Sequence, residues 1–358
     1  MKVVTVVGAR PQFIKAAVVS RMIRKQHEEI LVHTGQHYDV DMSDVFFEEL
    51  EIPKPDYNLG INGGSHAEMT AKMLVEIEKI LLEEKPDILL VYGDTNSTLA
   101  AALAAAKIHV PICHVEAGAR TYCATNPEEI NRICTDHISS LLLTCTKKSQ
   151  DNLAKEGLEH KGRFVGDPMY EAFCFYKDKA EHMSHYLKTL EGKEIEVPAR
   201  YYYLTCHREE NTIKDGALEE ILGAMEQLSY PAIYPVHPRN KKRAEALLER
   251  CHYKNIYLTN PVGYLTSIYL VMHAEKIVTD SGGLQREAFF AGKQCVTILD
   301  FEVWPETMVE NRNQLSRPDS KEIVEKLACE QNLDYDYKPF GNGMAAAAIV
   351  KELEKYLG

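Results

Sequence analysis

Acidic and basic side chains gather in the segment HVEAGARTYCATNPEEINR, residues 114–132. Glu116 lies in a glycine-containing turn directly after an apolar, strand-like run, and Glu128 and Arg132 lie in a helix that begins at a proline. A third acid, Asp94, follows the apolar run DILLVY. Taken singly, Asp94 is best explained as a helix N-cap and Glu128 as an acid that complements a helix dipole. Together, at the ends of neighbouring strands, the three acids predict a carboxylate cluster for proton transfer.

The helix of this segment has apolar residues at helical spacing, which we expect on its buried side. They are Ile130, Ile133, Cys134 and Ile138. Glu128 lies away from that stripe, one turn before Arg132. The helix is therefore expected to keep these two charged residues outside its apolar contact.

A candidate anion site follows the first apolar run, KVVTVV. The stretch GARPQFIK places Arg10 and Lys15 in the first turns of a helix whose start suits Pro11, and the free amides of a helix N-terminus attract anions. Neither GxGxxG nor GxxxxGK[ST] is present, so a dinucleotide is disfavoured. Taken alone, a capped helix with a solvated lysine explains this stretch equally well.

The second half of the chain places different groups after its apolar runs. The candidates are His207, His237, Ser281, Gly282, Gly283 and Glu287. A glycine-rich turn that opens a helix offers bare amides to a diphosphate, and Glu287, farther along that helix, can accept hydrogen bonds from ribose hydroxyls. A lone histidine is more often a satisfied buried residue, but His207 stands beside Arg208, which favours an anion contact.

Alternating apolar and amphipathic segments must position these groups. Their βαβα order predicts a parallel sheet covered by helices on both faces, and a second series of the same kind starts after EGKEIEVPAR. We expect an α/β fold with two doubly wound Rossmann-like domains, residues 1–168 and 169–340. The final helix, within residues 341–358, can pack back on the N-terminal domain. Because ligands bind at the carboxyl ends of such strands, the candidate residues fall where a site is expected.

The composition limits the class of protein. With 358 residues, 45% of them apolar, and no long uncharged apolar run, the chain fits a soluble two-domain protein without a membrane partner. A net charge of −12 disfavours nucleic acid as a partner. The nine cysteines are scattered and never form a CxxC pair, so neither a disulfide framework nor a metal site is predicted. The N-terminus has no signal-peptide pattern, and we expect a cytoplasmic protein.

An ordered set of motifs carries a resemblance to a known family. The chain resembles the non-hydrolysing UDP-N-acetylglucosamine 2-epimerases, including relatives that act on UDP-2,3-diacetamido-2,3-dideoxyglucuronate. The match runs through almost the whole chain, in the order GARPQFIK, HTGQHYD, YGDTNSTLA, HVEAGARTY, PEEINR, CHREENT, VHPRN and TDSGGLQREA. The resemblance implies a glycosyltransferase-B type fold with a UDP-sugar substrate in an interdomain cleft, and a homodimer.

The resemblance also implies residue roles. By resemblance, the catalytic carboxylates are Asp94, Glu116 and Glu128, with Lys15 and Arg132 nearby. The contacts with UDP are Arg10, His207, Ser281, Gly282 and Glu287. His207 is also predicted to be catalytic, and His237 and Gly283 are predicted to contact the substrate. The C2 hydrogen of such a sugar is not next to a carbonyl, so no enolate can form. Anti elimination of UDP to a glycal, followed by re-addition, requires a base on one face and an acid on the other. No metal or other cofactor is needed.

Some positions depart from the family pattern. The short interval from Glu116 to Glu128 and the segment FEVWPET favour the diacetamido-uronate branch over the UDP-N-acetylglucosamine branch. Asp39 and Lys72 stand where many relatives bind a second, activating substrate molecule, so activation is not expected. Ala119 stands where relatives have a leucine, and Asn126 stands where they have a larger apolar residue before the proline. These two changes are expected to affect loop packing and the sugar pocket more than the positions of the acids.

Three alternatives remain open at this point. A UDP-sugar glycosyltransferase can share the fold, because fold alone does not fix function. A hydrolysing 2-epimerase would release free UDP. A non-catalytic nucleotide-sugar binding protein would bind without turnover, although binding alone gives no reason to group three acids.

Overall fold

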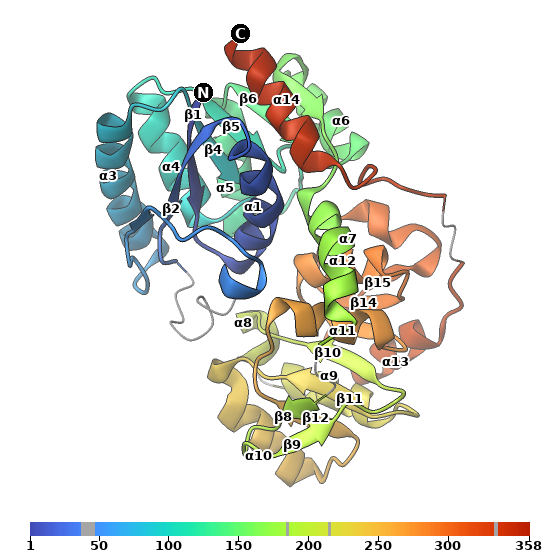
Figure 1. Cartoon of the computed structure of the whole chain (residues 1–358). Helices are drawn as coiled ribbons and strands as arrows, with labels where there is room; N and C mark the ends of the chain where they lie inside the picture. The colour runs from blue at the N-terminus through green and yellow to red at the C-terminus, as the bar shows by residue number, and fades with distance from the viewer. Residues whose placement is uncertain (37–46, 184–185, 214–215, 333–335) are drawn as a thin grey trace. The chain divides into compact units, whose positions relative to one another are not determined.

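The computed structural model describes residues 1–36, 47–183, 186–213, 216–332 and 336–358 (Figure 1). Asp39 therefore lies outside the described residues. The chain divides into two units, of which unit 1 comprises residues 1–174 and 338–358 and unit 2 comprises residues 175–337. The divisions predicted from the sequence pattern are at residues 168 and 340.

The sheet of unit 1 is parallel throughout, with strand order β3-β2-β1-β4-β5-β6-β7. Its strands are β1 (Lys2–Val7), β2 (Glu28–His33), β3 (Tyr57–Asn58), β4 (Ile88–Tyr92), β5 (Ile112–Val115), β6 (Leu141–Thr144) and β7 (Gly162–Phe164). Strand β1 pairs with both β2 and β4, so the order reverses between β1 and β4. This switch point is where doubly wound sheets bind ligands, at the carboxyl ends of the strands.

The helices of unit 1 cover this sheet. They are α1 (Arg10–Ile23), α3 (His66–Glu84), α4 (Asn96–Lys107), α5 (Pro127–Ile138), α6 (Lys147–Lys155), the start of α7 (Pro168–Ala180), and α14 (Ala345–Leu357), with the 3₁₀ turn η1 (Glu159–Lys161). Helices α3, α4 and α5 pack in sequence, and α14 packs against α1 (Figure 1). Alternate residues of the central strands, such as Val4 and Val6 of β1, share a core with Met73 and Ile77 of α3. The expected final helix therefore belongs to unit 1.

Three of the four residues of the apolar stripe expected on α5 are exposed, and the prediction was wrong for them, whereas Ile138 is partly buried and packs against the core of unit 1. Ile130 and Ile133 are 51% and 38% exposed, and Cys134 is exposed as well. The buried side of α5 instead carries polar residues, Arg132 and Asp136 among them. These side chains find charged partners at the strand ends, which offsets the cost of burying them. An apolar pattern alone therefore misplaces a helix whose inner face belongs to a polar site.

Unit 2 repeats the topology in the strand order β12-β11-β10-β13-β14-β15, again all parallel. Its strands are β10 (Tyr202–Thr205), β11 (Ala232–Pro235), β12 (Ile256–Thr259), β13 (Ile277–Thr279), β14 (Cys295–Ile298) and β15 (Asn313–Ser316), preceded by a hairpin of β8 (Tyr186–Lys188) and β9 (Glu194–Glu196). Its helices are the end of α7, α8 (Glu209–Thr212), α9 (Ala217–Glu226), α10 (Lys241–Cys251), α11 (Tyr264–His273), α12 (Gly282–Phe290) and α13 (Ser320–Ala328), with the turns η2 (Pro238–Asn240) and η3 (Pro305–Asn311). The predicted α/β class with two doubly wound sheets is confirmed.

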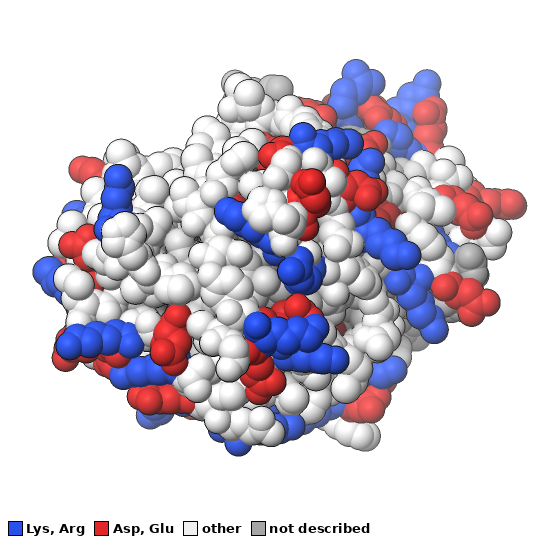
Figure 2. All heavy atoms as spheres, turned by 90° about the horizontal axis from the view of Figure 1, so that it is seen from above, with Lys and Arg blue, Asp and Glu red and all other residues white. Residues whose placement is uncertain are grey.

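The surface carries both signs of charge. Figure 2 shows Lys and Arg side chains interspersed with Asp and Glu over the face that it displays. The described atoms of that face therefore offer no broad basic area of the kind that nucleic acids need. In the part of the chain that the structure describes, no helix is both long and apolar enough to cross a bilayer.

Candidate active site

The turn after β1 is held to the end of β4 by one buried side chain, Gln12. Its Oε1 accepts hydrogen bonds from the Gly8 and Ala9 amides at 2.7 and 3.0 Å, while its Nε2 donates to the Tyr92 carbonyl at 2.7 Å. Arg10 is the first residue of α1 and is partly buried. Gln12 therefore fixes the entry of α1, and with it the position of Arg10, beside the switch point.

Gly8, in this same turn, has no room for a side chain. A Cβ at this position would lie 2.2 Å from both Ser97 Oγ and Thr34 Oγ1, which are themselves hydrogen bonded at 2.8 Å. Such a contact is too short for real atoms, so a glycine is required. The close approach brings the ends of β1, β2 and α4 together at the predicted site.

Lys15 and Glu116 form a buried ion pair at the switch point. The ammonium lies 2.5 Å from a carboxylate oxygen, and the two side chains are 2% and 5% exposed. The backbone of Glu116 has φ +73°, a left-handed conformation that is costly for a residue with a side chain. Its amide donates to the Leu143 carbonyl of β6 at 3.0 Å, which holds the strained turn in place. Strain of this kind is most often kept where it positions a functional group.

Asp94 and Arg132 form a second pair. The Arg132 guanidinium hydrogen bonds to the Asp94 carboxylate and also to Glu129 at 3.2 Å, while the side-chain amide of Asn131 donates to the backbone carbonyl of Asp94 at 2.8 Å. Burial alone would lower the pKa of Arg132, but the charges of Asp94, Glu116 and Glu129 outweigh it and raise that pKa. Arg132 is therefore the cation that links the carboxylates after β4 and β5.

Glu128 stands in the first turn of α5, partly buried and one turn before Arg132. Its amide donates to the side chain of Asn126, which caps the helix, at 3.0 Å. Its carboxylate makes no hydrogen bond or ion pair with the residues that the structure describes. Of the three predicted acids, Asp94 and Glu116 are thus already paired with cations, and Glu128 is the one without such a partner among those residues.

A metal is not required to neutralise this cluster. Glu116, Cys145 and Asp167 are buried with one donor atom each within 4.8 Å of the others, which is a spacing that could hold an ion. The Lys15 ammonium, however, already pairs with Glu116. A cation in that place would compete with a buried lysine, so the arrangement suits an amine–carboxylate pair better than a metal centre.

In unit 2, His207 after β10 is oriented by a buried acid, Asp280 after β13. His207 Nδ1 lies 2.8 Å from Asp280 Oδ1, and the Asp280 carboxylate accepts from the His207 and Arg208 amides at 2.9 and 2.8 Å. Burial would raise the pKa of Asp280, but the His207 charge and these hydrogen bonds lower it to about 2. Asp280, the acid directly before Ser281, was not among the residues predicted from the sequence.

The glycine-rich turn behaves as a helix N-terminus. Ser281 is the N-cap of α12, its Oγ accepts from the Leu284 amide at 3.4 Å, and Gly282 and Gly283 are the first two helical residues. Amides at this position have no carbonyl partner within the helix, which leaves them able to bind an anion. Glu287 lies in the same helix and is buried. The geometry suits a phosphate group with an acid beyond it.

His237 occupies the end of β11, next to β10 in the sheet. It caps η2, with Nδ1 accepting from the Arg239 amide at 3.3 Å. His207, His237 and Ser281 thus stand at the ends of three adjacent strands, β10, β11 and β13. Within unit 2 the predicted residues share one edge of the sheet, as the six predicted in unit 1 do.

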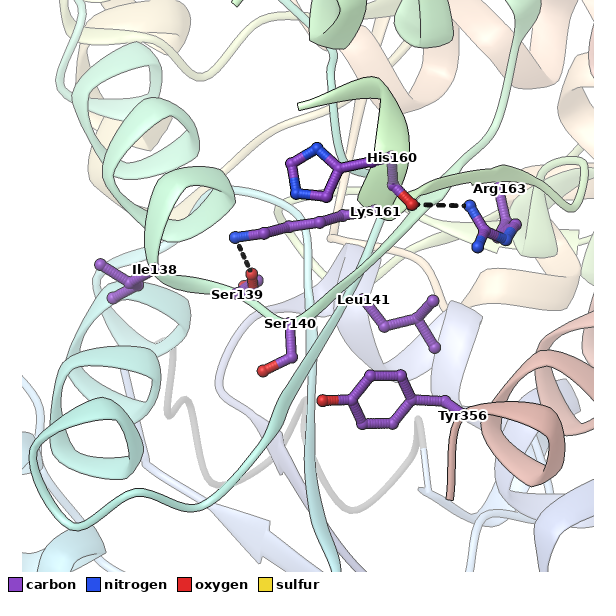
Figure 3. Close-up of a pocket in the computed structure, with 8 residues that line it drawn as sticks. All are labelled: Ile138, Ser139, Ser140, Leu141, His160, Lys161, Arg163 and Tyr356. Carbon is purple, nitrogen blue, oxygen red and sulfur yellow. Dashed lines mark hydrogen bonds between the residues drawn. The ribbon is translucent and has the colours of Figure 1, made fainter. Parts of the chain in front are cut away.

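A separate pocket of about 440 Å³ lies at the opposite edge of the unit 1 sheet, where β6 and β7 begin (Figure 3). Its lining includes His160, Lys161, Arg163 and Tyr356. Lys161 Nζ donates to the Ser139 carbonyl at 2.9 Å, and Arg163 donates to the His160 carbonyl at 3.1 Å. These cations cap backbone carbonyls, and the pocket is not part of the carboxylate cluster.

Two doubly wound parallel sheets with polar groups at the carboxyl ends of their central strands define an α/β protein of the glycosyltransferase-B fold type. Within that class the chain belongs to the UDP-N-acetylglucosamine 2-epimerase family, whose model matches residues 21–354. The predicted family is confirmed.

Relatives resemble the chain over its whole length. A UDP-N-acetylglucosamine 2-epimerase homolog of Methanococcus maripaludis is 46% identical, with 99% of both chains covered. A UDP-2,3-diacetamido-2,3-dideoxy-D-glucuronate 2-epimerase of Pseudomonas aeruginosa is 44% identical and covers 99% of this chain and 100% of its own. The solved structure of Methanocaldococcus jannaschii UDP-GlcNAc 2-epimerase in complex with UDP-GlcNAc and UDP has a TM-score of 0.89 at 38% identity, covering 99% of this chain and 100% of that one.

Proposed function

We propose that this protein is a non-hydrolysing UDP-N-acetylhexosamine 2-epimerase, which interconverts gluco- and manno-configured UDP-2-acetamido sugars. The observation that carries the proposal is the pair of cation–carboxylate contacts at the switch point of unit 1, Lys15 with Glu116 and Arg132 with Asp94. A site that only bound a nucleotide sugar would gain little from burying several acids. Acids held in such surroundings suit proton transfer at carbon.

The reaction proceeds in two steps. In the first, a carboxylate removes the proton from C2, the C2–H electrons form a C1–C2 double bond, and the C1–O bond breaks so that UDP leaves with its electron pair. In the second, a carboxylic acid protonates C2 of the glycal on the opposite face, and a UDP oxygen attacks C1. The candidates for base and acid are Asp94, Glu116 and Glu128. No atom is lost or gained overall, so no cofactor is consumed.

The groups of unit 2 suit the leaving group. We assign the diphosphate to the amides of Gly282 and Gly283, to Ser281 and to His207. Arg10 is a separate candidate for an anion contact in unit 1. His207, held by Asp280, can stabilise the negative charge that develops as UDP departs. We assign Glu287 to the ribose hydroxyls and His237 to a further contact with the substrate.

Two substrates of one chemical class are candidates. UDP-GlcNAc and UDP-2,3-diacetamido-2,3-dideoxyglucuronate share the UDP and the 2-acetamido group but differ at C3 and C6. A relative 44% identical is named for the diacetamido-uronate and one 46% identical is named as a homolog of the UDP-N-acetylglucosamine enzyme, so identity does not separate the two branches. The short interval from Glu116 to Glu128 and the FEVWPET segment favour the diacetamido-uronate.

Proton NMR in deuterated water tests the proposal. The protein is incubated with each UDP-sugar in turn, and we expect one of them to become its manno epimer with deuterium at C2 and without free UDP. Accumulating UDP with free sugar would instead identify a hydrolysing 2-epimerase. Absence of any change with both sugars would contradict the proposal and direct the search to acceptors and a glycosyltransferase.

We further propose a homodimer. Large apolar side chains are exposed on two helices that both pack against α4, namely Val75 (51%) and Leu82 (55%) on α3 and Ile130 and Ile133 on α5. Exposed apolar groups concentrated on one helical layer are typical of an interface between subunits. Light scattering should give twice the chain mass, and the variant Ile130→Glu should give a monomer. A monomeric unsubstituted protein would contradict the proposal.

We also propose that the protein works in the cytoplasm. All nine cysteines are free thiols, which suits a reducing compartment. Fractionation of cells that make the protein should recover it with cytoplasmic markers, and recovery in a secreted fraction would contradict this.

A further inference from the structure

A buried histidine, His114 of β5, joins the two loops that carry the paired acids. Its side chain is 0% exposed, and both ring nitrogens have partners. Nδ1 lies 2.7 Å from the Asp136 carboxylate on α5, and Nε2 lies 2.7 Å from the carbonyl oxygen of Gly93, directly after β4. His114 does not belong to the predicted site and has no assigned role in the reaction.

Both partners of this ring are hydrogen-bond acceptors. A carbonyl oxygen has no proton to give, and an ionised carboxylate has none either. The Asp136 carboxylate lies 2.7 Å from the Arg120 guanidinium and accepts from the Gly118 amide at 3.0 Å, which are the contacts of an ionised carboxylate. Both ring nitrogens therefore face acceptors, which is the arrangement that suits an imidazolium.

The charges around the ring suit that assignment. Arg120 lies 2.7 Å from Asp136 and 2.7 Å from Glu156, and the Asp136 and Arg120 side chains are almost fully buried. His137, half-exposed, lies 3.3 Å from Glu156 at the outer end of the network. With a charged His114, the network of His114, Arg120, Asp136 and Glu156 has two cations and two anions, of which Glu156 is partly exposed. A neutral ring would leave that network with one negative charge in excess.

The two contacts of the ring reach both acids through the backbone. Gly93 immediately precedes Asp94, and the carbonyl of Gly93 is the group that the ring holds. Asp136, held by the other nitrogen, accepts from the amide of Gly118 at 3.0 Å. Gly118 lies two residues after Glu116, in the turn whose φ of +73° at Glu116 needs outside support.

We propose that His114, as an imidazolium held between Gly93 and Asp136, is a positioning residue that fixes the loops of Asp94 and Glu116 relative to each other. The proposal rests on the proposed function, because it concerns the two acids assigned to proton transfer. Such acids must keep their geometry to within a fraction of an ångström, since a displacement of about 1 Å costs on the order of a hundredfold in rate.

Two substitutions separate the two contacts. In His114→Asn the side-chain amide takes the place of Nδ1 and can donate to Asp136, but it is too short to reach Gly93. In His114→Gln the amide takes the place of Nε2 and can donate to Gly93, while the contact with Asp136 is lost. For both we expect kcat to fall on the order of a hundredfold with KM little changed, because the loops shift while UDP is still bound.

Ile77→Ala on α3 is the matched control for lost stability. Ile77 is fully buried in the core of unit 1 and belongs to neither loop. This variant should lose thermal stability but keep its kcat at temperatures where it is folded. If Ile77→Ala loses as much kcat as the His114 variants, or if either His114 variant keeps the full kcat, the positioning role is overturned.

A spectroscopic measurement tests the charge independently of activity. Protein labelled with nitrogen-15 at histidine is measured by NMR, and the signals of His114 are identified because they are missing from the spectrum of His114→Asn. We expect both ring nitrogens of His114 to be protonated at neutral pH. One unprotonated nitrogen would overturn the proposal. Failure of the proposed function would look different, since the unsubstituted protein would then show no exchange at C2 whatever the spectrum of His114.

Discussion

The ammonium of Lys15 lies 2.5 Å from the carboxylate of Glu116, and both side chains are almost completely buried. The pair joins α1, which follows β1, to the turn after β5, across the end of β4. Each charge is tolerated in the interior because the other is present. Lys15 thus has a structural task in addition to any contact with the substrate.

Replacing Lys15 by methionine should therefore destabilise the protein. The carboxylate of Glu116 would remain buried without its cation, and breaking a buried pair in this way costs about 3–5 kcal/mol. Urea unfolding followed by circular dichroism measures the loss. The double variant Lys15→Met with Glu116→Gln removes both charges and should recover much of the lost free energy of unfolding. A loss below about 1 kcal/mol in the single variant would show that the ion pair contributes little to stability.

Glu116→Gln should retain UDP binding but lose deuterium incorporation at C2. The amide keeps the shape of the side chain but cannot take or give the proton, and loss of a general acid or base costs about 10²–10⁴-fold. Incorporation is followed by NMR and binding by calorimetry. Glu28→Gln is the control, because Glu28 is an exposed acid of β2 with a side chain 61% exposed. Normal incorporation in Glu116→Gln would remove Glu116 from the mechanism.

The depressed pKa of Asp280 makes a defined contribution to stability. The pKa of Asp280 in the folded protein, about 2, lies below its ordinary value of 3.8. The contribution of Asp280 to stability is therefore present above about pH 4 and is lost as the pH falls from about 4 to about 2. The difference amounts to about 2 kcal/mol at neutral pH. The asparagine in Asp280→Asn does not titrate. The difference in unfolding free energy between the unsubstituted protein and this variant should therefore be smaller at pH 3 than at pH 7, by about 1 kcal/mol. An unchanged gap would contradict the assignment.

UDP binding should change the fluorescence of the protein. The chain has a single tryptophan, Trp304, whose Nε1 lies 3.6 Å from where a Cβ on Gly282 would stand. A diphosphate on the amides of that turn would add charge close to the indole. We expect a saturable change on titration with UDP that uridine alone does not reproduce. A signal indifferent to UDP would argue against the glycine turn as the diphosphate site.

Much of the fold could be predicted because its strands are short, apolar and buried. Runs such as KVVTVV and DILLVY correspond to β1 and β4, and the amphipathic segments between them form helices. Elements with weaker patterns were not predicted, among them β3 with two residues and the hairpin β8–β9 in a charged stretch. The order of strands in each sheet also could not be read from local patterns, because it depends on contacts between distant segments.

The site could be predicted only in its outline. Strand ends indicated where Asp94 and Glu116 would lie in unit 1 and where His207 would lie in unit 2. The pairing of Lys15 with Glu116, however, joins residues far apart in sequence. The left-handed conformation of Glu116 has no local signal, since glutamate rarely adopts it. The buried side of α5 was misjudged for a related reason: its polar residues are inside because their partners lie on other elements.

The contact of α14 with α1 has a consequence for how the protein is made. Unit 1 consists of the first and last parts of the chain, with the whole of unit 2 between them in sequence. A ribosome therefore completes unit 2 before it has made α14, the helix that packs against α1. Since domains fold as units during synthesis, unit 1, which carries the predicted carboxylates, stays unfinished until α14 has been made. A chain that stopped before α14 would carry a complete unit 2 attached to an incomplete unit 1.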